Sequence, residues 1–141
     1  MAYLFCVLAA LLWGFVYAVD GKLLKTLTPN AIIFVNGVLA LAFSAAVFAY
    51  RGFNVQKFLG QEADAKTMGI TFAAHSLTIV ASFFAFSAIV KIGSSTAAML
   101  EISYPFFVIL FSWLLFNQTI SKEVLIGGIL IFIGCLLIFS K

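Results

Sequence analysis

Long apolar stretches, separated by short polar segments, dominate the chain. Five of them are long enough, or nearly so, to cross a bilayer as a helix. They cover about residues 2–19, 31–50, 68–90, 96–116 and 124–139. The pattern predicts an all-α membrane protein with five transmembrane helices, formed by a single domain over residues 1–141.

The polar segments predict short turns and one longer linker. The turns fall at residues 20–30, 91–95 and 117–123, which carry Gly, Pro, Ser or Asn. Thr28 followed by Pro29 predicts a helix N-cap with proline at the first helical position. Residues 51–67 hold five charges and predict a solvated linker with room for one short surface helix.

Small residues indicate where the predicted helices pack closely. In lipid, helix association depends on close backbone approach, which glycine and alanine permit. Gly127 and Gly134 lie seven residues apart on the fifth apolar stretch. We therefore expect these two glycines to form a packing seam.

Composition makes lipid the solvent of this protein. Of its 141 residues 65% are hydrophobic and 9% charged, and the mean hydropathy is +1.20. A soluble domain of this size cannot bury that much apolar surface. The 8 basic and 5 acidic residues do not cluster, so no nucleic-acid partner is expected.

The sequence offers little material for enzyme or metal chemistry. It has one histidine and no nucleophile–base motif or phosphate-binding glycine loop. Cys6 and Cys135 both lie in apolar stretches and are interpreted as small buried hydrophobic residues. We expect no enzyme activity, cofactor, metal site or disulfide.

The positive charges do not indicate an orientation in the membrane. Five spans place the two termini on opposite sides. The N-terminal side holds Arg51, Lys57, Lys66 and Lys122, and the other side holds Lys22, Lys25, Lys91 and Lys141. Such a tie allows insertion in both orientations with antiparallel pairing, a fixed orientation with the N-terminus inside, or the reverse. Inverted halves are a common way to build a transporter with its site at the midplane.

Glu101 is the most informative polar residue. It lies inside the fourth apolar stretch, four residues before Pro105. A carboxylate near the bilayer centre costs about 2.5 kcal/mol or more unless it is protonated, paired or hydrated. Pro105 cannot donate to the carbonyl of Glu101 and predicts a helix kink. Glu101 is therefore a candidate for substrate binding or proton coupling, with a hydrogen-bonded structural acid as the alternative.

Helical rise places four other side chains at a depth similar to that of Glu101. They are Trp13, Tyr17, Asn36 and Tyr104. An acid, an amide and aromatic walls in one layer suit a cationic, zwitterionic or amphipathic ligand. The alternatives are helix–helix hydrogen bonding by Asn36 and packing by Trp13.

His75 lies on the third apolar stretch in the other half of the bilayer. Its depth separates it from Glu101 within one chain. In an antiparallel dimer the second copy would bring its His75 to the depth of Glu101, where the pair could relay protons. The alternative is a hydrogen bond from His75 to Ser82 or to a backbone carbonyl.

The order of landmarks resembles the EamA-like domain of the drug/metabolite transporter superfamily. The similarity spans the chain. Its motifs are Leu11-Leu12-Trp13-Gly14-Phe15, Leu27-Thr28-Pro29, the run from Ala85 to Ala98, Tyr104-Pro105-Phe106, Leu115-Phe116 and the run from Leu125 to Gly134. The resemblance implies a five-helix half of an inverted-repeat transporter in a prokaryotic inner membrane. It names no substrate.

Two positions depart from the pattern of that family. Asn117-Gln118 stands where a glycine–glutamate pair is usual, and the family commonly has no acid at the place of Glu101. The role of Glu101 therefore depends on the physical argument alone. We expect a small-molecule transporter that works by alternating access, pairs with itself or with a paralogous half, and is coupled to protons. A non-transporting accessory subunit is the alternative.

Overall fold

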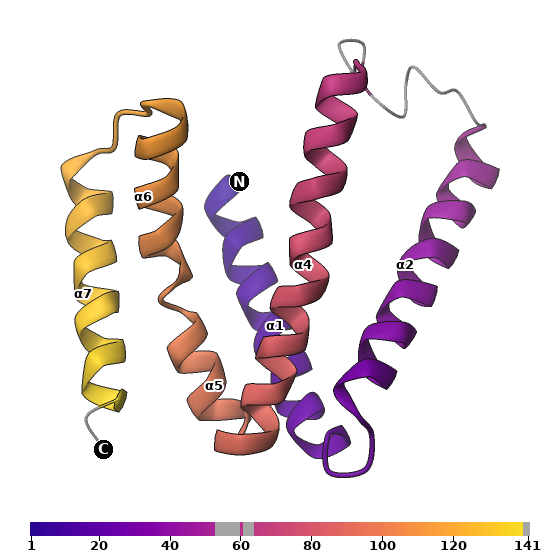
Figure 1. Cartoon of the computed structure of the whole chain (residues 1–141), viewed down its shortest axis with the longest axis horizontal. Helices are drawn as coiled ribbons and strands as arrows, with labels where there is room; N and C mark the ends of the chain where they lie inside the picture. The colour runs from indigo at the N-terminus through magenta and orange to yellow at the C-terminus, as the bar shows by residue number, and fades with distance from the viewer. Residues whose placement is uncertain (53–59, 61–63, 140–141) are drawn as a thin grey trace. The chain divides into compact units, whose positions relative to one another are not determined.

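A computed structural model describes residues 1–52, 60 and 64–139 of the chain. The regular structure of these residues is entirely helical (Figure 1). The helices are α1 (Ala2–Leu23), α2 (Pro29–Arg51), α4 (Ala65–Ile92), α5 (Ser94–Glu101), α6 (Tyr104–Phe116) and α7 (Lys122–Phe139). The all-α fold predicted from the sequence is confirmed. Most of the predicted linker at 51–67, with its surface helix, lies outside the described residues.

Four segments of the described chain are long and apolar enough to cross a membrane. They are Ala2–Leu23, Pro29–Tyr50, Ala65–Ile92 and Ser94–Phe116. Helix α7, with 18 residues and a length of about 27 Å, covers the fifth predicted span but is not one of these four. The first helix continues to Leu23, beyond the predicted end at residue 19, so Asp20 is helical rather than part of a turn.

The fourth span is not one continuous helix. Helix α5 ends at Glu101 and α6 begins at Tyr104 (Figure 1). The N–H groups of Ile102 and Ser103 turn back to the carbonyls of Ala98 and Leu100, both at 3.1 Å. Pro105 lies in the first turn of α6, where a missing N–H costs no helical hydrogen bond. The chain therefore starts a new helix at the proline.

The backbone forms two compact units, Met1–Lys25 with Ala88–Lys141, and Thr26–Ser87. In the first unit α6 and α7 form an antiparallel hairpin (Figure 1). The rings of Phe106 and Phe132 stack across it with centroids 4.8 Å apart. A Cβ added to Gly128 would lie 2.8 Å from Cδ1 of Ile109.

Within the described chain the two glycines predicted to form a packing seam on the fifth span make no close contact. Gly127 and Gly134 have no atom within 4 Å of an added Cβ, whereas the neighbouring Gly128 is buried against α6. Successive residues of a helix point about 100° apart, so Gly128 faces α6 while its neighbour Gly127 points to another side of α7.

Cys135 joins α7 to the end of α5. Its side chain is 4% exposed, and its Sγ donates to the carbonyl of Met99 at 3.3 Å. Met99 lies two residues before the end of α5, so α7 holds the chain just ahead of the break. Both cysteines are free, and Cys6 is exposed on α1 rather than buried as expected.

The second unit contains α2 and most of α4. The predicted start of α2 is confirmed, because Thr28 Oγ1 accepts from the N–H of Ala31 at 3.3 Å and Pro29 is the first helical residue. Asp64 caps α4 in a similar way, with Oδ1 accepting from the N–H of Thr67 at 2.7 Å.

The Asp64 cap is expected to depend on pH. Hydrogen bonds from Thr67 lower the pKa of the Asp64 carboxyl from its ordinary value of 3.8. The cap therefore contributes its full stabilisation above pH 3.8 and loses it as the pH falls through the lower pKa of the folded protein. The amide proton shift of Thr67 should titrate with a midpoint below that value. Asp64→Asn should keep the cap and abolish the titration, whereas a midpoint at or above 3.8 in the native chain would contradict the assignment.

Candidate functional site

Glu101 lies at the break in the fourth span. It is the last residue of α5, and its side chain is exposed. Next to the break, the N–H groups of Ile102, Ser103 and Phe106 bond to other carbonyls, and none of these bonds reaches the carbonyl of Glu101. A carboxylate and a backbone carbonyl whose usual helical donor is replaced by Pro105 thus occur together within this apolar span, where such groups need a proton, an ion or water.

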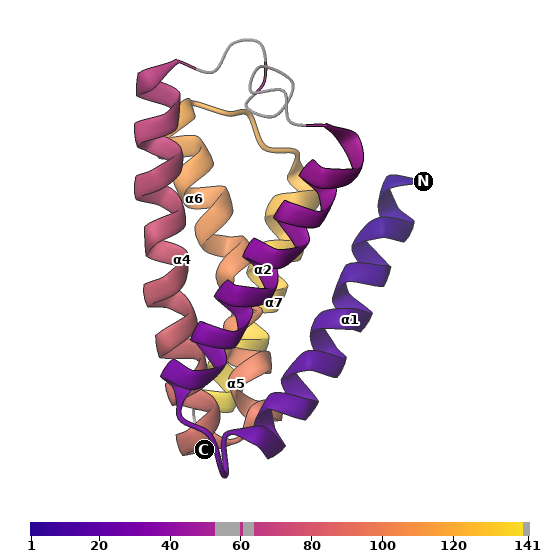
Figure 2. The same cartoon turned by 90° about the vertical axis from the view of Figure 1, so that its right-hand side faces the viewer.

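The C-terminal end of α1 packs on α5, and the two helices run in opposite directions (Figure 2). A tight contact brings Gly21 of α1 against Ser94 of α5: a Cβ added to Gly21 would lie 2.5 Å from the Ser94 Oγ. From this contact Glu101 is seven residues along α5, or about 10.5 Å, and Trp13 is eight residues along α1, or about 12 Å. Tyr17 is about 6 Å from it.

These distances along the helix axes give the relative positions of Trp13, Tyr17 and Glu101, three of the residues predicted from the sequence. Trp13 and Glu101 lie at similar distances from the α1–α5 contact, and Tyr17 lies between that contact and them. Tyr17 is half-buried and Trp13 is 65% exposed. Tyr104 begins α6 three residues after Glu101 and is 62% exposed. Asn36 belongs to the other unit, where its side chain is exposed on α2.

His75 lies on a polar face of α4. The polar residues of this face follow one another at intervals of 4, 4, 3 and 4 residues, which keeps them on one side of a helix. They are Thr67, Thr71, His75, Thr78 and Ser82. The hydroxyls of Thr71 and Ser82 donate to the carbonyls four residues earlier, both at 2.9 Å. Among the described residues no hydrogen bond links His75 to Ser82, the alternative proposed from the sequence.

A small groove of about 320 Å³ follows the same helix. It is lined by Met68, Thr71, Phe72, His75, Ser76 and Ile79. The hydroxyl of Ser76 donates to the carbonyl of Phe72 at 2.8 Å. Among the nitrogen- and oxygen-bearing side chains of this groove, the imidazole of His75 is therefore the one without a hydrogen bond within the described chain.

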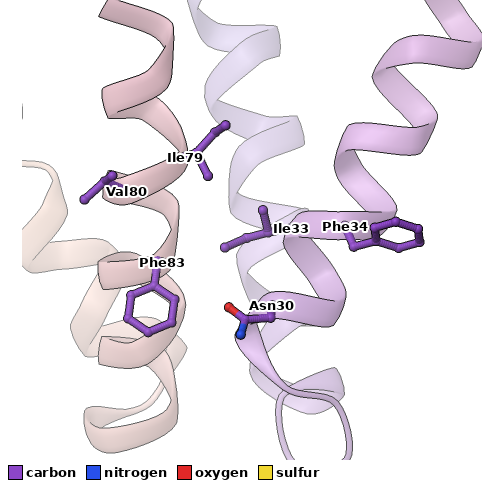
Figure 3. Close-up of a pocket in the computed structure, with 6 residues that line it drawn as sticks. All are labelled: Asn30, Ile33, Phe34, Ile79, Val80 and Phe83. Atoms are coloured by element: carbon purple, nitrogen blue, oxygen red, sulfur yellow. The ribbon is translucent and has the colours of Figure 1, made fainter. Parts of the chain in front are cut away.

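A larger groove of about 510 Å³ lies between α2 and α4 (Figure 3). Its lining consists of Asn30, Ile33, Phe34, Ile79, Val80 and Phe83. Asn30 and Ile33 point from α2 toward α4, whereas Phe34 points away. With one polar side chain, this groove offers an apolar surface and no catalytic or ion-binding group.

The sequence interpretation missed two contacts of α5, Gly21 with Ser94 and Cys135 with Met99, and the burial of Asp20. The sequence pattern places Asp20 in a turn, whereas in the structure it is helical, 6% exposed and next to Gly21 of the α1–α5 contact. The local signal was present, since Tyr17, Asp20, Gly21 and Leu24 fall on one helix face. The contact between Cys135 and Met99 joins residues 36 apart, and no local pattern marks it.

Long apolar helices, one of them broken beside a carboxylate, define a multi-pass integral membrane protein. Within the described residues no group of three or more His, Cys, Asp or Glu side chains could hold a metal ion. The model of the EamA-like transporter family matches residues 1–140, and the chain belongs to that family. It is a family of transporters, not of enzymes. Comparison with curated proteins and with solved structures gave no match.

Proposed function

We propose that this protein is a proton-coupled half-transporter for a small cationic, zwitterionic or amphipathic molecule. One observation carries the proposal: the transmembrane helix of a transporter-family chain breaks at an exposed carboxylate, Glu101. Broken helices commonly form the substrate and coupling-ion sites of transporters, because their free backbone groups and polar side chains replace water there. Glu101 would exchange a proton against substrate, with Trp13, Tyr17, Asn36 and Tyr104 lining the cavity.

The polar faces of the second unit support a paired assembly. Asn36 and His75 are exposed in the single chain. In a bilayer such groups require a polar partner or water. A second half in inverted orientation would cover these side chains and enclose a midplane cavity, as the balanced positive charges also suggest. The partner is a second copy of this chain or a paralogous half, and the assembly belongs in a prokaryotic inner membrane.

In such a pair, protonation of Glu101 and substrate binding would alternate as the cavity opens to each side. Pro105 would let α5 and α6 reorient about the break, because no continuous hydrogen-bond ladder joins them. His75 of the second copy would reach the depth of Glu101 and relay protons to it.

A topology experiment tests the pairing. One C-terminal reporter is active inside the cell and another outside, each fused to the full chain. We expect signal from both, because neither side of the membrane has an excess of Lys and Arg. Signal from one side alone would contradict antiparallel pairing of identical chains and would require a paralogous half.

Flux into proteoliposomes tests transport itself. The purified chain, with any paralogous half that the reporters require, is given a panel of organic cations and zwitterions that includes tetraphenylphosphonium. We expect uptake of at least one compound, driven by an imposed pH gradient and abolished by a protonophore. No gradient-dependent uptake from the complete assembly would favour the accessory-subunit interpretation.

A further inference from the structure

Asp20 is a buried carboxylate that the proposed coupling through Glu101 does not use. Four residues between Met1 and Leu24 are not exposed, and they share one face near the C-terminal end of α1. They are Tyr17, Asp20, Gly21 and Leu24. Asp20 itself is 6% exposed. Because Gly21 of this face lies against Ser94 and α5 is the helix that α1 mainly contacts, Asp20 lies on the side of α1 that packs on α5, next to the residue that touches its first turn.

The first turn of α5 contains several backbone N–H groups that have no hydrogen-bond partner within the helix. Gly93 precedes the helix with φ +81° and provides no capping side chain. Its carbonyl accepts from the N–H of Ala97 at 3.0 Å, which leaves the N–H groups of Ser94, Ser95 and Thr96 without a partner inside the helix. Such a terminus carries partial positive charge and attracts an anion.

The charged groups around Asp20 do not neutralise it. Lys22 and Lys25 follow it on the chain, Lys91 ends α4, and Glu101 lies at the far end of α5. All four are exposed, and in the described part of the chain no ion pair or side-chain hydrogen bond involves Asp20. The carboxylate thus has two ways to be stabilised in its buried place: attraction by the α5 terminus or uptake of a proton.

We propose that Asp20 is a second proton-binding site, whose charge state controls the contact between α1 and α5. When ionised, the carboxylate is attracted by the α5 terminus and holds the two helices together. When a proton from water binds to it, the side chain becomes neutral, that attraction is lost and the helices separate more readily. The use of this contact as a gate depends on the proposed transport function, whereas the proton-dependent contact itself does not.

The test compares two neighbouring cysteines at the start of α5. Ser94 is half-buried against Gly21, whereas Ser95 is exposed. Ser94→Cys and Ser95→Cys are made separately in full-length chains that carry Cys6→Ser, and the maleimide labelling rate of each is measured from pH 4 to pH 8. The ratio of the two rates cancels the pH dependence of thiol chemistry. We expect the ratio for position 94 over 95 to rise about fivefold at low pH, the effect of losing one charge–helix interaction.

Three variants identify the responsible group. Asp20→Asn should show the high ratio at every pH, and Asp20→Glu, which keeps the acid, should retain a pH-dependent ratio even if the Asn variant fails to fold. Glu101→Gln should leave the pH dependence of the labelling ratio as it is in the native background. A ratio that does not change with pH in the native background, or one whose pH dependence disappears in Glu101→Gln, would overturn the proposal. Neither outcome depends on a transport assay, so both are separable from failure of the proposed function.

Discussion

Glu101→Gln is expected to lower proton-driven uptake into proteoliposomes by at least about tenfold, a loss of about 1.4 kcal/mol in transition-state stabilisation. The amide has nearly the shape of the acid and can still donate and accept hydrogen bonds. It cannot bind and release a proton. The expected loss is therefore of coupling, with the fold unchanged. Uptake is measured with the compound that the native chain transports best, with and without an imposed pH gradient.

The chain offers a matched control for this substitution. Glu123 lies in the first turn of α7 and is exposed. Glu123→Gln removes the same charge away from the break and should leave proton-driven uptake unchanged. Glu101→Asp should retain part of the coupling because it keeps a titratable carboxyl group. Unchanged flux and unchanged pH dependence in Glu101→Gln would show that Glu101 is a structural acid.

Gly21→Ala is expected to destabilise the protein by about 1–3 kcal/mol, the usual cost of overpacking a tight contact. A Cβ at this position would lie 2.5 Å from Oγ and 2.8 Å from Cβ of Ser94, so α1 and α5 must move apart. Among the described residues this contact is the main one that α1 makes, and residues 2–16 of the helix are exposed. The measurement is thermal or denaturant unfolding in detergent.

Gly14 is the control on the same helix. No atom lies within 4 Å of a Cβ added there, so Gly14→Ala should be neutral or stabilising, because alanine is the better helix former by about 1 kcal/mol. Ser94→Gly removes both clashing atoms and should restore most of the stability lost in Gly21→Ala, whereas Ser94→Ala should restore less. Equal effects of alanine at positions 14 and 21 would contradict the α1–α5 contact.

Much of the fold follows from local patterns in the chain. The apolar stretches predict their helices because an unpaired backbone group in lipid costs several kcal/mol, and a helix satisfies these groups within one segment. The start of α2 at Thr28 and Pro29 is predicted for a similar reason, since a cap joins residues three apart. The polar residues of the candidate site, Glu101 above all, are visible as exceptions within apolar stretches.

The depth of a side chain also follows from its position along a helix, but its direction does not. The constant rise per residue is enough to place Glu101 and Trp13 at similar heights. Whether these two side chains meet in a cavity depends on helix rotation and on the proposed pairing with a second half. That part of the site stays a prediction.

The sequence by itself determined that this is a helical membrane protein, where its apolar segments lie, and that a carboxylate interrupts one of them. Each of these features depends on interactions between near neighbours in the chain. Only the tertiary structure decided that Gly128 rather than Gly127 contacts α6, that Cys135 holds the end of α5, that Gly21 lies against Ser94, and that Asp20 is buried. These contacts join distant residues, so they depend on how each helix is rotated and on which neighbour it meets.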